Sequence, residues 1–226
     1  MKISEIFLKS LSIRDELKKN DDFSENPIDD SLLPVLPFRI TNNIKLIIIG
    51  QDPTVKNPES RKFIEYSLNL DKLGSLRIYI GKICDGLEIK FDNIYATNIF
   101  KYFYTDPPAT TPLVLQSHLE KNLELLKKEL SAYPKVPIIT LGLPVLQLLV
   151  DKNAQVNYYW NHKGITHKSG GVFNYCEAID NKLNRDLFPF PHQPSYSGKE
   201  FYKNTFIDYL NFMKNKIQQF KTNYNE

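Results

Sequence analysis

Four short apolar runs, spaced roughly 45 residues apart, constrain the fold of this chain more than any other feature. They occupy residues 45–49, 93–97, 136–141 and 186–190, with the sequences KLIII, NIYAT, VPIITL and DLFPF. Runs this short and this continuously apolar are typical of strands that are buried on both faces of a parallel sheet. We therefore expect four parallel strands at these positions.

Helical patterns separate and follow these runs. Leucines recur at spacings of three and four over residues 115–130, and Thr111 and Pro112 provide an N-cap and a first-turn proline for that helix. Further helices are expected over residues 143–150 and 199–220. Alternating strands and helices predict an α/β fold with right-handed crossovers, built as a three-layer αβα sandwich around a four-stranded parallel sheet.

The composition is that of one packed domain. Apolar residues make up 42% of the 226 residues, which is enough to bury a core, and no low-complexity linker divides the chain. We expect a single domain over residues 1–226, with residues 1–40 as an N-terminal helical extension. That extension carries acidic residues and has no long apolar run, so we expect no membrane segment and a cytoplasmic monomer.

Charge and cysteine content limit the chemistry. The formal net charge is only +3, so any surface that binds nucleic acid has to be local. The two cysteines, Cys84 and Cys176, are too few for a four-cysteine metal or cluster site. We expect neither a metal site nor a redox cofactor.

Polar side chains follow three of the four expected strands. Ligands of open α/β sheets bind beyond the carboxyl ends of the strands, where the segments after all the strands meet. Those segments are Gly50–Pro53, Asn98–Phe100, Gly142–Pro144 and Pro191–Ser195. They would bring together Asp52, Asn98 and His192. An aspartate can position water or stabilise a cation, a histidine can donate to a departing anion, and an asparagine amide matches the edge of a nucleobase.

The first of these segments resembles a glycosylase motif. The sequence IIIGQDP is similar to the first motif of the uracil-DNA glycosylase superfamily, in which an apolar strand ends in Gly-Gln-Asp-Pro. Tyr66 falls where that family has an aromatic that stacks on uracil, and Ser75 lies in a segment similar to the family's Pro-Ser-Leu. Asn98 ends the second strand, as the uracil-reading asparagine does. IITLGLP resembles the third strand and its turn, and His192–Ser195 resembles the second catalytic motif, His-Pro-Ser-Pro.

The resemblance implies an enzyme that flips a base out of DNA and hydrolyses its glycosidic bond. Catalysis would fall to Asp52, which stabilises the sugar cation and orients water, and to His192, which hydrogen-bonds the uracil oxygen. The base-binding residues would be Gln51, Tyr66 and Asn98. The residues that contact DNA would be Pro53, Ser75, Ser195, Tyr196 and Lys199. DNA is the implied partner, and no cofactor is implied.

Two departures from the family pattern favour other hypotheses. Thr54 replaces the tyrosine that normally excludes the thymine methyl, and Gln193 is inserted between the histidine and proline of the second motif. They motivate an alternative function: a catalytically weak or inactive protein of this fold that binds nucleic acid or a protein partner. A small-molecule α/β hydrolase is a third hypothesis, although the chain has no glycine-rich phosphate loop and no nucleophile elbow.

Each site residue also has a purely structural interpretation. Asp52 could cap a helix, Asn98 could serve a turn, and Tyr66 could belong to the core. His192 could be an ordinary exposed loop histidine. The loop over residues 161–171, rich in lysine and glycine, could touch DNA phosphates, but its composition is more typical of a solvated loop.

Overall fold

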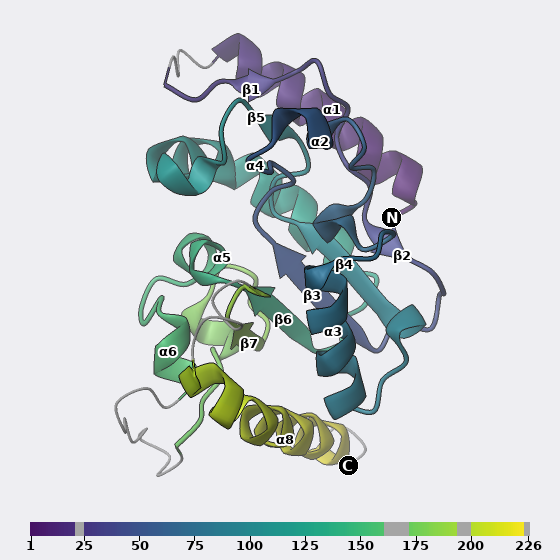
Figure 1. Ribbon diagram of the computed structural model, residues 1–226, viewed down its shortest axis with the longest axis vertical. Coiled ribbons are helices and arrows are strands. Elements are labelled where there is room, and N and C mark those ends of the chain that lie inside the picture. Colours follow the sequence, from purple (N-terminus) through teal and green to yellow (C-terminus); the bar gives the residue numbers. More distant parts are fainter. Residues whose placement is uncertain (21–24, 161–171, 194–199, 224–226) are drawn as a thin grey trace.

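The computed structural model describes residues 1–20, 25–160, 172–193 and 200–223 (Figure 1). At its centre is a five-stranded, mostly parallel sheet in the order β2-β4-β3-β6-β7. The parallel strands are β3 (Leu46–Gly50), β4 (Ile94–Asn98), β6 (Ile138–Leu141) and β7 (Leu187–Phe190). Each begins and ends within two residues of an apolar run, and every residue in them is buried, as a sheet covered on both faces requires.

The sheet has one strand more than the sequence predicts. β2 (Phe38–Arg39) pairs antiparallel with β4 at the edge of the sheet. The four predicted parallel strands are present, and the fifth strand was not predicted because a two-residue edge strand is too short to show a periodic pattern. A separate pair joins β1 (Ile28–Asp29) to β5 (Phe103–Tyr104), so residues 1–40 contribute two strands as well as a helix.

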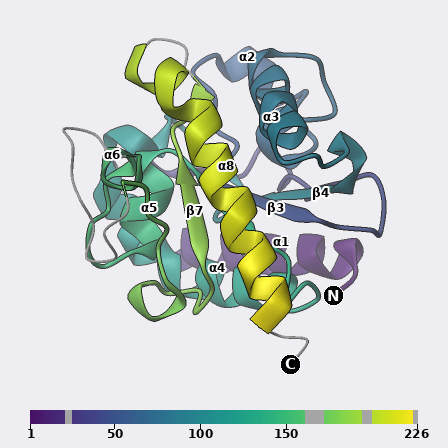
Figure 2. The same cartoon turned by 90° about the horizontal axis from the view of Figure 1, so that it is seen from below.

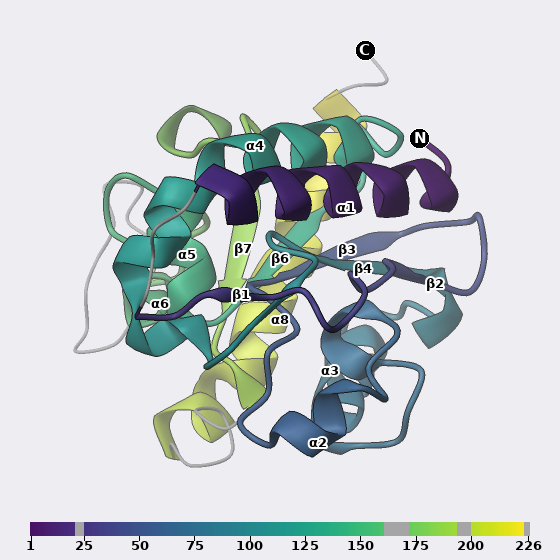
Figure 3. The same cartoon turned by 90° about the horizontal axis from the view of Figure 1, so that it is seen from above.

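Helices lie on both faces of the sheet (Figure 2 and Figure 3). α1 and α4 pack against each other on one face, and α3 and α8 pack against each other on the other. Among the residues that the structure describes, no helix is both long and apolar enough to cross a membrane. The helices are α1 (Ile3–Asn20), α2 (Pro58–Arg61), α3 (Ser75–Gly86), α4 (Pro112–Leu130), α5 (Leu143–Leu149), α6 (Val156–Tyr159) and α8 (Glu200–Asn223).

α4 begins where the sequence predicts. Thr111 does stand at the N-cap position, but its side chain makes no hydrogen bond to the first turn of the helix. Its hydroxyl instead accepts a hydrogen bond from Asn26 Nδ2 at 2.9 Å. The predicted N-cap position and first-turn proline are therefore confirmed, and the threonine hydroxyl contacts the N-terminal extension. The leucine stripe of this helix is buried against the core, as its spacing predicts.

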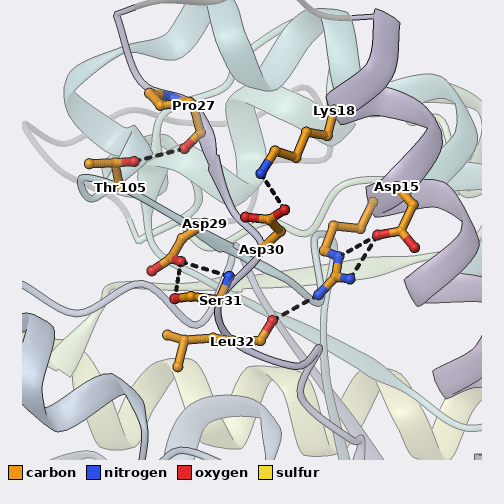
Figure 4. A network of polar contacts seen from close by, with 9 residues as sticks. Asp15, Lys18, Pro27, Asp29, Asp30, Ser31, Leu32 and Thr105 are labelled. Carbon is orange, nitrogen blue, oxygen red and sulfur yellow. Dashed lines mark hydrogen bonds and ion pairs between the residues drawn. The ribbon is translucent and has the colours of Figure 1, made fainter.

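Polar contacts hold the N-terminal extension together and join it to the segment after β5 (Figure 4). Arg14 is 8% exposed and donates a hydrogen bond to the Leu32 carbonyl at 2.9 Å, while Lys18 forms an ion pair within the extension. Beyond the end of β5, the backbone N–H of Thr105 donates to the Pro27 carbonyl at 2.9 Å. The extension therefore supports β5, the strand that also supports the site described below.

Candidate active site

A cavity of about 290 Å³ lies at the carboxyl ends of the parallel strands. Gln51, Asp52 and Thr54 line it after β3, Gly142 and Pro144 after β6, and His192 after β7. Gly50 and Leu141 at the ends of β3 and β6, Leu68, and the segment after β5 complete the described lining. The cavity thus lies where the topology of an open α/β sheet predicts a ligand, and its volume is at the small end for sites that hold small molecules.

Asp52 is half-buried in a tight turn after β3. Its Oδ1 accepts a hydrogen bond from the Thr54 N–H at 2.7 Å. Burial raises the pKa of Asp52 to about 6, because it outweighs the lowering by the Thr54 hydrogen bonds and by the charge of Arg61. Asp52 does not cap α2, since the capping side chain is that of Asn57. At neutral pH it is a carboxylate with a proton affinity suited to holding water in a reaction.

Two residues fix this turn to β5. The Thr54 hydroxyl accepts a hydrogen bond from the backbone N–H of Tyr104 at 2.9 Å. Arg61 is 3% exposed and donates to the carbonyls of Val55, Tyr104 and Thr105 at 2.9, 3.0 and 2.7 Å. Sequence reasoning singled out Thr54 for its size alone and missed Arg61, because nothing in the local sequence shows which carbonyls a buried arginine will reach.

His192 follows β7 at the opening of the cavity. Gly142 has a left-handed backbone (φ 88°), and a Cβ added there would lie 3.3 Å from the Cβ of His192. The residue before His192 is anchored, because the Tyr79 hydroxyl donates to the Pro191 carbonyl at 3.1 Å. Although the residue is exposed, desolvation by the surrounding protein lowers the pKa of His192. The imidazole is therefore neutral at pH 7 and has one N–H to donate.

Asn98 lies directly behind the cavity wall. It is fully buried, and neither Nδ2 nor Oδ1 has a hydrogen-bond partner among the described residues. A Cβ added at Gly50 would lie 2.6 Å from Asn98 Oδ1, so only glycine fits between this amide and the cavity. The buried Nε2 of Gln51 also lacks a partner among the described residues. Two amide groups at one cavity are thus left without the hydrogen bonds that buried polar groups ordinarily make.

The structure separates the other predicted residues from the cavity. Tyr66 is half-buried and packs edge-on against Phe38, with ring centroids 6.4 Å apart. Pro53 is buried, and Ser75 is exposed at the first residue of α3. In the part of the chain that the structure describes, none of these three, nor Asn98, lines the cavity. Three predicted DNA contacts lie outside the described residues: Ser195, Tyr196 and Lys199. The loop 161–171 also lies outside them.

Both cysteines and His118 lie in the core. Cys84 and Cys176 are buried free thiols, and burial raises their pKa values to about 12 and about 11, so both are protonated at neutral pH. His118 is buried and hydrogen-bonds the Tyr104 hydroxyl at 3.0 Å. Within the described ranges, no group of three or more His, Cys, Asp or Glu residues could hold a metal ion.

Asp52 and His192 are the titratable groups in the described lining of the cavity. One is an aspartate with a raised pKa, and the other is a neutral histidine, so a base and a hydrogen-bond donor share one small cavity. The sequence matches no protein-family model, and no curated protein matches it.

Proposed function

We propose that the protein is a DNA glycosylase of the uracil-DNA glycosylase superfamily, which excises uracil or a related deaminated base. The observation that carries the proposal is that Asp52 and His192, far apart in sequence, line one cavity at the carboxyl ends of β3 and β7. These are the residues that the two family-like motifs nominate. We also propose that the helices on the two faces of the sheet form the three-layer αβα sandwich of that superfamily.

The proposed reaction begins when the target nucleotide rotates out of the DNA and its base enters the cavity. The bond between the base nitrogen and C1′ of the sugar then breaks, and its electron pair leaves with the base. The Asp52 carboxylate stabilises the cationic sugar and orients a water molecule, whose oxygen forms the new bond to C1′. Neutral His192 donates a hydrogen bond to the base oxygen on which negative charge accumulates. The proton released by water finally neutralises the departing base.

Base recognition would use the amide groups at the cavity wall. An asparagine amide offers an oxygen acceptor and a nitrogen donor in one plane, which complements the adjacent N–H and C=O of uracil. Asn98 and Gln51 carry buried amide atoms that have no partner among the described residues. Since leaving such an atom unpaired costs about 1–3 kcal/mol, a base that pairs with it would recover that free energy on binding.

Base release from a panel of oligonucleotides tests the proposal. Single- and double-stranded DNA containing uracil, hypoxanthine, xanthine or a thymine mismatch would be incubated with purified protein, and the free base measured by mass spectrometry. We expect uracil release, reduced about 10²–10⁴-fold by His192→Ala, which removes the donor to the leaving base. Ile179→Ala, at an 88% exposed position outside the described lining, is the control. Failure to release any base would refute the enzyme proposal.

The alternative is a catalytically weak or inactive member of this fold that binds nucleic acid or a protein partner. It is favoured by Thr54, whose hydroxyl is engaged by the backbone of β5 in place of the family's bulky tyrosine. The same panel separates the two hypotheses. Salt-sensitive DNA binding without base release from any oligonucleotide would support the alternative.

A further inference from the structure

We propose that Leu68 is a specificity-determining residue that seals the Asn98 amide from the cavity, and that an entering base displaces its side chain. The inference rests on the glycosylase function proposed above. It adds the residue that controls access to the base-reading amide, and it explains why that amide does not line the cavity.

Leu68 and the Asn98 amide are neighbours beside Gly50. A Cβ added at Gly50 would lie 2.5 Å from Leu68 Cδ2 and 2.6 Å from Asn98 Oδ1, so these two atoms lie within about 5 Å of each other. Leu68 lines the cavity, whereas Asn98 has no exposed surface. The leucine methyl group and the amide oxygen therefore both lie beside Gly50, and of these two residues only Leu68 belongs to the described lining of the cavity.

The amide that Leu68 covers is destabilising as it stands. Both polar atoms of Asn98 are buried without a partner in the described part of the chain, and an aliphatic methyl group offers them none. Each unpaired buried polar atom costs about 1–3 kcal/mol. A second state in which the leucine has moved and a base pairs with the amide removes this cost, which gives the base a driving force to displace the leucine.

The backbone of Leu68 is also strained. Leu68 and Asn69 have left-handed backbones, with φ of 59° and 51°, and a left-handed leucine costs about 1–2 kcal/mol. The flanking residues are anchored: Ser67 N–H donates to the Leu36 carbonyl at 2.8 Å, and Leu70 is fully buried. Leu68 therefore has a strained backbone between two well-held residues, and its side chain can move while Ser67 and Leu70 stay in place.

Removing the leucine side chain tests the seal directly. The readout is the side-chain NH₂ signal of Asn98 in ¹⁵N NMR spectra of the full-length protein, with free uracil as the probe. In Leu68→Ala we expect hydrogen exchange of this NH₂ to be about tenfold faster than in the native protein, because solvent reaches the amide. We also expect uracil to shift the signal at about tenfold lower concentration, because no side chain has to be displaced.

Two further variants make the test specific. Leu73→Ala, a 92% exposed position in the same connection, should leave both readouts at native values. Leu68→Gly should open the amide as Leu68→Ala does and also tolerate the left-handed backbone, so it provides a folded variant if alanine destabilises the loop.

Each contrary result overturns the inference in a different way. Unchanged exchange in Leu68→Ala and Leu68→Gly would mean that Leu68 does not seal the amide. Faster exchange with no uracil shift of the Asn98 signal would mean that the displaced leucine does not admit a base to this amide. Base release by the native protein tests the proposed function separately, so loss of one conclusion does not decide the other.

Discussion

Single residues of the site are held in unfavourable surroundings. Burial disfavours the charged form of Asp52, the Asn98 amide has no partner among the described residues, and Leu68 has a left-handed backbone. Each feature lowers stability; Asp52 and Leu68 line the cavity, and Asn98 lies beside Gly50 of its lining. Destabilising features that gather at one place are typical of functional sites, where the geometry needed for the reaction lowers the stability of the fold.

Asp52→Asn should therefore stabilise the fold at pH 7. The folded pKa of about 6 lies above the unfolded value of about 3.9, so between these values only the folded state holds the proton, and stability falls as pH rises. A neutral asparagine avoids this loss. We expect a free energy of unfolding about 1–3 kcal/mol higher at pH 7, with the gain absent below pH 4. Urea denaturation at both pH values measures it, and a less stable variant at pH 7 would contradict it.

Gly50→Ala should damage the fold and the site together. The added Cβ would lie 2.5 Å from Leu68 and 2.6 Å from Asn98, which forces one of them to move. We expect the free energy of unfolding to fall by about 1–3 kcal/mol, as for other overpacked positions. Gly81→Ala in α3 is the matched control, because its Cβ would meet nothing within 4 Å. Equal denaturation midpoints for the two variants would show that the space behind Gly50 is not tight.

At the scale of elements, the site depends on contacts between segments that are distant in sequence. The turn after β3 is fastened to β5 by Thr54 and by Arg61, which stands at the end of α2. β5 in turn pairs with β1 of the N-terminal extension. The position of the Asp52 carboxylate is therefore set by a chain of neighbouring elements as well as by its own turn.

Arg61→Met should shift the pH dependence of base release. Arg61 lowers the pKa of Asp52 through its charge, so its loss should raise that pKa above about 6. Because the carboxylate is the reactive form, activity should fall off on the acidic side at a higher pH than in the native enzyme. The three carbonyls left without the guanidinium should also lower the free energy of unfolding by about 2–4 kcal/mol. An unchanged acidic midpoint would show that Arg61 has only a structural role.

The sequence predicts elements well where burial imposes a pattern. Each parallel strand is a continuous apolar run, and each was found within two residues of its predicted bounds. β1, β2 and β5 have only two residues each, so no periodicity could reveal them. Their existence depends on tertiary pairing, which local sequence does not determine.

At the scale of the whole molecule, topology explains why part of the site is predictable. Parallel strands end at one edge, so the residues after β3 and β7 meet, and this rule correctly brought Asp52 and His192 to one cavity. The rule does not say whether a side chain at that edge lines the cavity or is buried beside it. Asn98 is the last residue of β4, yet it lies beside Gly50 and outside the described lining, to which Leu68 from a distant loop contributes instead.

The N-terminal extension should stabilise the molecule without taking part in the reaction. α1 packs on α4; its Ile6 is 2% exposed, and its partly buried Ile13 and Leu17 pack against the hydrophobic core. Deleting residues 1–20 should therefore lower the free energy of unfolding by about 3 kcal/mol or more. The acidic midpoint of base release should not move, because no residue of α1 belongs to the described lining. An unchanged free energy of unfolding after the deletion would contradict a stabilising role of the N-terminal extension.

The most direct measurement is the single-turnover rate of uracil release from a uracil-containing oligonucleotide by the native protein and by Asp52→Asn. We predict release by the native protein and a rate about 10²–10⁴-fold lower for Asp52→Asn, while the exposed Asp71→Asn keeps the native rate. A native protein that releases no uracil, or an Asp52→Asn variant as fast as the native protein, would contradict the assignment of this cavity as a glycosylase active site.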